Sequence, residues 1–256
     1  MLVDPPVLTI LALSAFCAGF VDAVVGGGGL IQIPALFTAL PNSLPATIFG
    51  TNKFASVFGT CNAAYRYASR VRMPWGTTLP AALAAFACSY LGAMAVAWLP
   101  RELLRPLILA LLIGAAAYTF WRKDLGRLHR PQHAGRRELV YALLVGGAIG
   151  FYDGFFGPGT GSFLIFLFVR FFGFDFLHAS AAAKVVNVAT NLAALSFFVP
   201  NGYLLPVLAV AMALFNVLGS LVGTHLALRR GSGFVRQMFL IVVGALILKF
   251  AYDTFT

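Results

Sequence analysis

The sequence predicts an all-α polytopic membrane protein built from two inverted repeats, each with about five apolar elements. Three observations predict this fold class. The chain of 256 residues is 60% hydrophobic and only 10% charged, which leaves too little polar surface to cover a water-soluble domain of this size. Its apolar residues gather in stretches of membrane length, without the short alternating segments of a membrane β-barrel. One set of motifs also occurs twice along the chain.

Ten apolar elements follow one another along the chain. In the first half they cover about 7–25, 29–40, 46–65, 75–99 and 102–121, and in the second half 138–156, 160–172, 177–198, 203–228 and 234–252. A helix of about 20 residues spans a bilayer, whereas element 29–40 would reach only about 18 Å. Glycines separate this short element from the preceding one. We therefore expect glycine-broken or re-entrant helices near the midplane, where protein or water covers the irregular backbone.

The repeat is visible at a single offset of 131 residues. Gly-Phe-Val-Asp at 19–22 matches Gly-Phe-Tyr-Asp at 150–153. Further pairs at the same offset are Gly26 with Gly157, Gly28 with Gly159, Lys53 with Lys184, and Arg105 with Arg236. This pattern predicts a first transmembrane repeat at 1–121, a basic linker at 122–137 and a second transmembrane repeat at 138–256.

The positions of basic residues predict the orientation of the repeats. Basic loops are those with Arg66, Arg70 and Arg72, the linker 122–137, and the loop with Arg229, Arg230 and Arg236. The loop at 200–203, which corresponds to the first of these, carries no charge. The positive-inside rule then places the basic loops in the cytoplasm and both termini on the opposite side of the membrane. The net charge of +10 is therefore interpreted as a topology signal, with no nucleic acid as partner.

Two lysines lie in the middle of membrane-length stretches, Lys53 in 46–65 and Lys184 in 177–198. A cation at the centre of such a helix costs about 2.5 kcal/mol or more, so it usually faces a polar cavity and has a partner. Two lysines at matching positions predict a pathway for an anion. A structural ion pair or interhelical hydrogen bonding is the alternative interpretation.

Polar side chains accompany both lysines. Thr51 and Asn52 directly precede the first lysine, whereas Lys184, Asn187 and Asn191 have the spacing i, i+3 and i+7 that places them on one helix face. Amide and hydroxyl groups can donate hydrogen bonds to an oxygen-rich anion. These residues are predicted to bind substrate, with interhelical hydrogen bonding as the alternative.

Two glycine motifs, 26–29 and 157–162, precede the short elements of the two halves. Glycine lets backbone N–H groups converge, and the N-terminus of the following helix adds partial positive charge, so the motifs are predicted to contact an oxyanion. The candidates are Gly27, Gly28, Gly29, Gly159, Thr160, Gly161 and Ser162. The alternative is close helix packing, for which Gly146, Gly150 and Gly154 already have suitable spacing. A dinucleotide fingerprint is excluded because no strand precedes the motif.

Asp22 and Asp153 occupy equivalent positions just before the glycine motifs. Three roles stay open: binding of a coupling proton or cation, pairing with the lysines, and capping of a broken helix. Gln32 could reach the same cavity. The cysteines at 17, 61 and 88 lack metal-ligand spacing, and no motif of a zinc site or an activated nucleophile is present. We therefore expect no metal, no cofactor and no enzyme activity.

The motif at 19–34 (GFVDAVVGGGGLIQIP), together with Gly-Thr-Asn-Lys at 50–53, resembles the sulfite exporter TauE/SafE family. The motifs at 157–162 and 184–187 are similar to the second repeat of that family, and the resemblance covers nearly the whole chain. It implies an inner-membrane carrier for a sulfur oxyanion or an organosulfonate such as sulfite or sulfoacetate. The expected partners are this small anion, the lipid bilayer and a coupling ion, H⁺ or Na⁺.

Two other functions are weighed against a carrier. An anion channel would use the same cavity without a gating cycle, and a membrane-embedded enzyme or assembly factor is a third interpretation. The direction of transport, the coupling ion and the oligomeric state stay open at this point.

Overall fold

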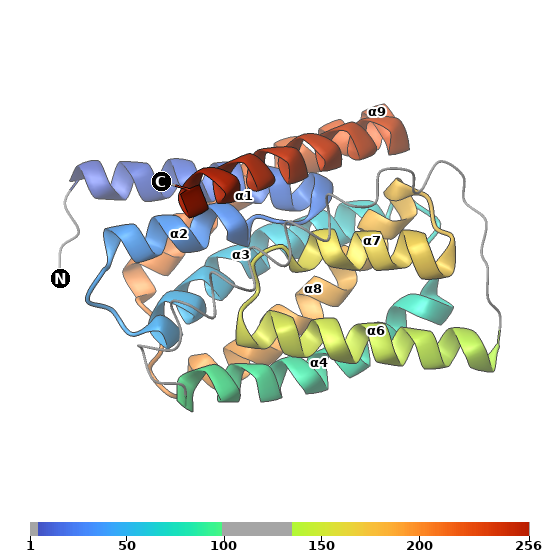
Figure 1. The fold of residues 1–256 in the computed structure, drawn as a ribbon, viewed down its shortest axis with the longest axis horizontal. Helices are drawn as coiled ribbons and strands as arrows, with labels where there is room; N and C mark the ends of the chain where they lie inside the picture. Colours follow the sequence, from blue (N-terminus) through green and yellow to red (C-terminus); the bar gives the residue numbers. More distant parts are fainter. Residues whose placement is uncertain (1–4, 99–134, 256) are drawn as a thin grey trace.

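The computed structural model describes residues 5–98 and 135–255, and all regular structure within these residues is helical (Figure 1). The first half contains α1 (Pro5–Val25), α2 (Gly29–Ala39), α3 (Pro45–Ala68) and α4 (Trp75–Trp98). The second half contains α6 (Arg136–Phe155), α7 (Thr160–Phe172), α8 (Phe176–Phe198) and α9 (Pro206–Phe255). The predicted helical class is thus confirmed for the described residues. The predicted element 102–121 and nearly all of the linker 122–137 lie outside them.

Five helices of the described residues are long and apolar enough to cross a membrane: α1, α4, α6, α8 and the first part of α9. Helix α3 has 24 residues but does not belong to this set, which corrects the description of 46–65 as an apolar stretch. Its threonine, asparagine and lysine side chains are buried inside the protein, where other polar groups meet them. Helices α2 and α7, with 11 and 13 residues, are too short to span.

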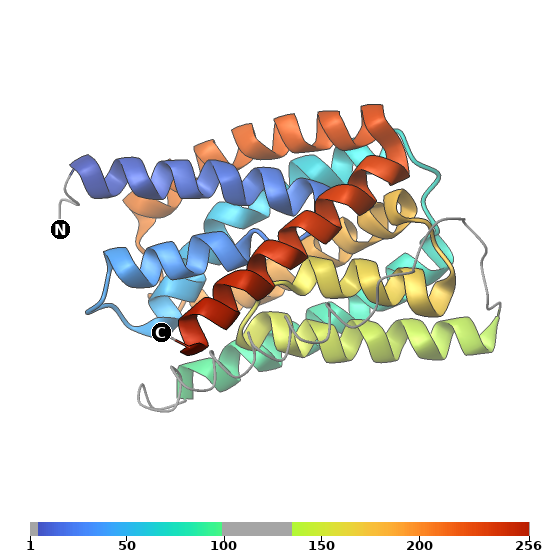
Figure 2. The same cartoon turned by 45° about the horizontal axis from the view of Figure 1, so that its top comes forward.

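Helix α9 combines the two predicted elements 203–228 and 234–252. Gly231 divides it, because its φ of 71° and ψ of −167° lie outside the helical region. Figure 2 shows the consequence: the second segment of α9 turns back and crosses the face of the molecule diagonally. The chain therefore still has two helical segments here, as predicted.

The helices form layers, and helices of one half pack against helices of the other half. Helices α1 and α9 lie along one side of the molecule and α4 and α6 along the opposite side, with α2, α3, α7 and α8 between them (Figure 1). The most extensive packing joins α4 to α6 and α1 to α9. The last described helix of each half therefore packs against the first helix of the other half.

Glycines allow these exchanged pairs to approach closely. A Cβ added to Gly146 of α6 would lie 2.2 Å from Ala81 O of α4, and one added to Gly154 would lie 1.9 Å from Ser89 O. The same holds between α9 and α1, where a Cβ on Gly219 would lie 2.0 Å from Phe16 O. These glycines serve backbone-to-backbone packing, which is typical of small residues at membrane helix interfaces.

The chain reverses direction at each glycine motif. Helix α2 runs back toward the end of the molecule at which α1 begins, and α7 runs back toward the end at which α6 begins (Figure 1). These two ends are opposite. Both chain termini lie at the end where α1 begins, and the α3–α4 connection and the bend in α9 lie at the other.

Candidate functional site

The first glycine break follows α1, and side chains from three other helices satisfy the carbonyl groups at its end. A helix end leaves its last carbonyls without donors in the same helix. The donors here are Tyr67 Oη to Ala23 O (3.0 Å), Ser180 Oγ to Val24 O (2.9 Å) and Ser162 Oγ to Val25 O (3.0 Å). The residues come from α3, α8 and α7, so the break is fixed by hydrogen bonds to the helices around it.

The second break, between α6 and α7, packs directly against the first. Gly26 has a φ of 66° and Gly159 a φ of 81°, values that other residues rarely adopt. A Cβ added to Gly161 would lie 2.5 Å from Gly26 Cα, so neither position tolerates a side chain without backbone movement. Ser162 Oγ also donates to Gly26 O across this contact. The two glycine motifs, 135 residues apart when counted from Gly26 to Gly161, thus meet in the interior.

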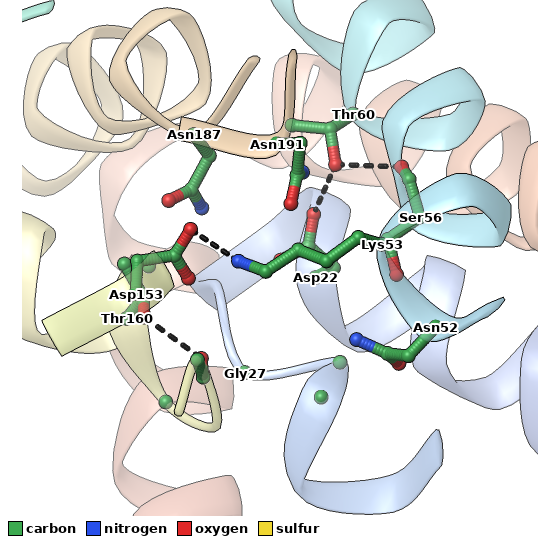
Figure 3. A pocket seen from close by; sticks show the side chains of 15 residues that line it. Asp22, Gly27, Asn52, Lys53, Ser56, Thr60, Asp153, Thr160, Asn187 and Asn191 are labelled. Carbon is green, nitrogen blue, oxygen red and sulfur yellow. Dashed lines mark hydrogen bonds and ion pairs between the residues drawn. The ribbon is translucent and has the colours of Figure 1, made fainter. Parts of the chain in front are cut away.

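A small polar cavity with a volume of about 30 Å³ lies at this meeting point (Figure 3). Its lining residues come from both halves: Asp22, Gly27, Gly28, Gly29, Asn52, Lys53, Ser56, Thr60, Asp153, Gly157, Gly159, Thr160, Gly161, Asn187 and Asn191. The structure therefore brings together most of the residues that the sequence singles out.

Lys53 and Asp153 form a tight ion pair across the cavity. Lys53 Nζ donates to Asp153 Oδ2, and the two side chains are only 4% and 6% exposed (Figure 3). A buried charge of either sign costs several kcal/mol unless an opposite charge and hydrogen bonds compensate it. This pair accordingly joins α3 of the first half to α6 of the second.

Lys184 and Asp22 form a looser pair. Lys184 Nζ lies 3.3 Å from Asp22 Oδ2, and the lysine side chain is 0% exposed whereas the aspartate is 18% exposed. The ammonium group makes no hydrogen bond of acceptable geometry. Asp22 Oδ2 also accepts a hydrogen bond from Thr60 Oγ1 at 3.2 Å. Asp22 is thus shared between a lysine of the second half and a threonine of the first.

The pairing is reciprocal between the halves. Lys53 of the first half pairs with Asp153 of the second, and Lys184 of the second half pairs with Asp22 of the first. Of the three roles considered for the aspartates, lysine pairing is the one for which the structure supplies contacts.

Two helix N-termini also face the cavity. The lining glycines 27–29 precede or begin α2, and residues 159–161 precede or begin α7. N–H groups in the first turn of a helix lack acceptors in that helix, and the helix dipole adds about half a positive charge at each N-terminus. With both lysines and both aspartates ionised, the side-chain charges cancel. The helix N-termini therefore leave the cavity favourable for negative charge.

Two asparagine side chains in the lining have unused acceptors. Asn52 Oδ1 and Asn187 Oδ1 are buried without a hydrogen-bond partner. Buried polar atoms are almost always hydrogen-bonded, so these positions point to a polar molecule in the cavity, water included.

Three predicted residues lie outside the lining. Thr51 Oγ1 donates to Thr47 O at 2.7 Å and accepts from Leu205 N at 3.1 Å, so it ties α3 to the segment before α9. Ser162 caps the end of α1, and Lys184 reaches the cavity only through Asp22. Thr51 and Ser162 therefore hold neighbouring segments together, whereas Lys184 acts on the cavity through its contact with Asp22.

Ser56 and Thr60 line the cavity but were not among the sequence candidates. The signal that identifies them is the repeat itself: the offset of 131 relates Ser56 to Asn187 and Thr60 to Asn191. They extend the stripe from Lys53 with the same i, i+3 and i+7 spacing.

Within residues 5–98 and 135–255, no group of three or more His, Cys, Asp or Glu side chains is arranged to hold a metal ion. The cavity offers hydrogen-bond donors and charges without an activated nucleophile. Such a site can bind and release a polar solute.

Comparison with known families gives the assignment. The family model described as sulfite exporter TauE/SafE matches residues 11–250. The chain belongs to the TauE/SafE family. The resemblance drawn from the glycine and lysine motifs is therefore confirmed at the level of the family.

Curated relatives agree over the full length. A probable membrane transporter protein, ORF9, from a Sinorhizobium species is 36% identical over 247 residues, which cover 96% of this chain and 93% of the relative. The probable membrane transporter protein YfcA of Escherichia coli K12 is 33% identical over 253 residues, covering 99% and 93%. A probable membrane transporter protein of Haemophilus influenzae is 33% identical over 247 residues, covering 96% and 95%. No solved structure matches the chain. The chain is therefore a multi-pass membrane protein of a transporter family.

Proposed function

We propose that this chain is a secondary carrier that moves a small sulfur oxyanion or organosulfonate, such as sulfite or sulfoacetate, through the cavity between its halves. The observation that carries the proposal is the reciprocal pairing of two intramembrane lysines with two aspartates at the meeting point of two helix N-termini. Intramembrane ionisable residues commonly mark a transport pathway. Half-helix N-termini near the midplane commonly bind anionic substrate groups in transporters.

The charge distribution favours an anion over a cation. Each lysine is paired with an aspartate, so the side-chain charges balance and the two positive helix ends decide the preference, because they repel a cation. An oxyanion finds backbone N–H groups at 27–29, 159 and 161, hydroxyl donors from Ser56 and Thr60, and amide donors from the asparagines. Binding then requires only a rearrangement of the ion pairs, in which a lysine turns from its aspartate to the substrate.

Transport follows from an exchange of roles between the halves. The halves are inverted repeats, each with a re-entrant glycine break: in support, α2 and α7 turn back toward opposite ends of the molecule. The basic α3–α4 loop faces the cytoplasm of a bacterial cell and both termini face the periplasm, as the positive-inside rule predicts. Rocking of one half against the other would expose the cavity to each side in turn.

Asp22 is the candidate site for the coupling ion, H⁺ or Na⁺. Its side chain is 18% exposed, against 6% for that of Asp153, and its lysine partner makes no hydrogen bond of acceptable geometry. A cation bound at Asp22 would release Lys184 toward the anion. Asp22→Asn should therefore retain exchange of labelled anion across the membrane but lose accumulation driven by an H⁺ or Na⁺ gradient. Accumulation at the wild-type level in this variant would exclude the assignment.

Flux in proteoliposomes tests the carrier function. Wild-type protein is compared with Lys53→Ala and Lys184→Ala against sulfite, sulfate, thiosulfate and sulfoacetate. Val207→Ala is the control, because Val207 is 88% exposed on α9 and far from the cavity lining. We expect one or more sulfur anions to be transported by wild type and control, with at least a tenfold loss in both lysine variants.

Other outcomes separate the alternatives. Normal flux in Lys184→Ala, with the protein folded, would contradict the role of the second pair. Voltage-driven currents without saturation or counterflow would establish a channel in place of a carrier. No flux of any sulfur anion by the wild-type protein would exclude this substrate class.

A further inference from the structure

A second cavity lies away from the glycine breaks, at the C-terminal end of α3 and along α9 just before Gly231. Its volume is about 560 Å³, within the range of roughly 300–1,000 Å³ that is usual for small-molecule sites. It is lined by Tyr65, Arg66, Ser69, Arg70, His225, Leu228 and Arg229. It shares no lining residue with the candidate transport site.

Three arginines from distant parts of the chain converge on this cavity. Arg66 lies in the last turn of α3 and Arg70 in the turn that follows it, whereas Arg229 comes from α9 in the other half. No acidic side chain lines the cavity, and none of the three arginines belongs to an ion pair between described residues. Arginines that only set the orientation in the membrane need to lie in the loops but need not lie together. Like charges gathered around one cavity repel each other until an anion neutralises them.

One guanidinium is already oriented by the protein. Arg66 Nη1 donates to Leu221 O of α9 at 3.2 Å, which fixes the plane of the group and leaves its other N–H donors available. A planar guanidinium with free parallel donors matches the oxygens of a phosphate group. Arg70 and Arg229 are exposed and line the same cavity, so their guanidinium groups can turn toward the same phosphate.

The cavity is not built for an inorganic ion alone. Its volume is far larger than one such ion needs, and Tyr65 and Leu228 add apolar surface to the lining. Tyr65 is 76% exposed at the end of a membrane-length helix, a position where tyrosine commonly marks the lipid headgroup level. Basic pockets between membrane helices on the cytoplasmic side are known to bind acidic lipid headgroups.

We propose that this cavity binds the phosphate headgroup of an anionic phospholipid, with the guanidinium groups of Arg66, Arg70 and Arg229 around the phosphate. The lipid then bridges α3 of the first half and α9 of the second at the end of the molecule that carries the basic loops.

Titration of the purified full-length protein with short-chain phosphatidylglycerol or phosphatidylcholine, followed by native mass spectrometry, tests the proposal. The variant Arg70→Gln/Arg229→Gln removes two exposed guanidinium groups and leaves the Arg66 hydrogen bond intact. At about fivefold per arginine, we expect it to bind phosphatidylglycerol roughly 30-fold more weakly than wild type. The control Arg72→Gln/Arg170→Gln removes the same charge from two exposed positions that do not line this cavity, and it should change binding less than twofold.

Three results would overturn the proposal. Equal binding of phosphatidylcholine would remove the requirement for negative charge. An equal loss in the control variant would attribute binding to general surface charge. Competition by millimolar inorganic phosphate that removes the lipid completely would identify a site for a free anion instead.

Discussion

The lysine–aspartate pairs Lys53–Asp153 and Lys184–Asp22 join equivalent positions of the two halves, yet they differ in contact and exposure. The first is hydrogen-bonded and buried on both sides, whereas in the second Lys184 is fully buried and Asp22 is partly exposed. Related sequence motifs therefore occupy two different environments in one molecule. Under the carrier mechanism proposed above, such a difference is expected of a single state, and the opposite state should exchange the two environments.

Replacement of each lysine by methionine gives the largest expected effect. Lys53→Met leaves Asp153 buried without its partner, so we expect a loss of about 3–5 kcal/mol in the free energy of unfolding. Lys184→Met leaves Asp22 partly exposed and still bonded to Thr60, so the expected loss is about 1–3 kcal/mol. Urea unfolding in detergent micelles measures both.

A double variant separates charge from packing in the tight pair. Lys53→Met/Asp153→Asn removes both charges and should recover much of the stability lost in Lys53→Met. Equal losses in the two single lysine variants would show that the two pairs are equivalent in solution, against the geometry described above.

Gly161→Ala tests whether the two glycine breaks must touch. The added Cβ would lie 2.5 Å from Gly26 Cα, and overpacking of this kind typically costs about 1–3 kcal/mol. Gly147→Ala is the matched control, because its Cβ would meet only Cys88 Sγ at 3.4 Å and helical alanine is favoured over glycine. Thermal unfolding should show a lower midpoint for Gly161→Ala and an unchanged or higher one for Gly147→Ala.

Thr60→Val acts on the looser pair and on one contact within α3, because Thr60 Oγ1 also donates to Ser56 O at 2.9 Å. It removes the 3.2 Å hydrogen bond to Asp22 while keeping the shape of the side chain, at a cost of about 1 kcal/mol. Ser56→Ala, one turn earlier in the lining, removes a hydroxyl for which no bond to either aspartate is present in the structure. Isothermal unfolding should register a loss in Thr60→Val only, and an equal loss in Ser56→Ala would count against the shared role of Asp22.

Asp175, which lies outside the membrane-spanning helices, gives the stability of the fold a pH dependence of its own. It caps α8 by accepting from Leu177 N at 2.8 Å and His178 N at 2.9 Å, and it accepts from Ser232 Oγ at 3.0 Å. Burial raises the pKa of this carboxyl, but the hydrogen bonds and the neighbouring His178 outweigh it and hold the pKa below its ordinary value. The carboxylate therefore stabilises the fold above about pH 4, and this contribution is lost as the pH falls through the lowered pKa.

Asp175→Ala should accordingly lower the free energy of unfolding by about 1 kcal/mol at pH 7, and the difference from wild type should shrink below about pH 4. Asp175→Asn is the control, since asparagine also caps helices but does not titrate. A wild-type-to-Ala difference that is constant down to pH 3 would show that the charge of Asp175 makes no contribution.

The sequence predicts much of the site because the repeat places equivalent residues at one offset. Both lysines, both aspartates and both glycine motifs were identifiable in this way, and the helices occur close to where hydrophobic stretches predict them. The same offset also identifies Ser56 and Thr60. Serine and threonine are common in membrane helices, however, so their residue types alone do not indicate a site. Their importance follows from the position of Lys53 on the same face.

Other features depend on contacts that no local pattern contains. Helix α4 packs on α6 and α1 packs on α9. Hydrophobic periodicity identifies each of these helices but does not indicate which helix it will pack against. The positions of Thr51 and Ser162 outside the cavity depend on which carbonyl or amide groups lie nearby in space. Helix α3 tolerates its polar residues because the threonine, asparagine and lysine side chains are buried against other helices.

The packing of α1 against α9 also has a consequence for the order of assembly during synthesis. About 180 residues separate the end of α1 from the start of α9. At roughly 5–20 residues per second, the ribosome needs on the order of 10–40 s to complete this interval. During that time α1 is already in the membrane without its principal neighbour, and the surface of α1 that will receive Gly219 of α9 is open to lipid or to the insertion machinery. A nascent chain stopped before Pro206 should therefore hold α1 in the bilayer but lack the α1–α9 interface.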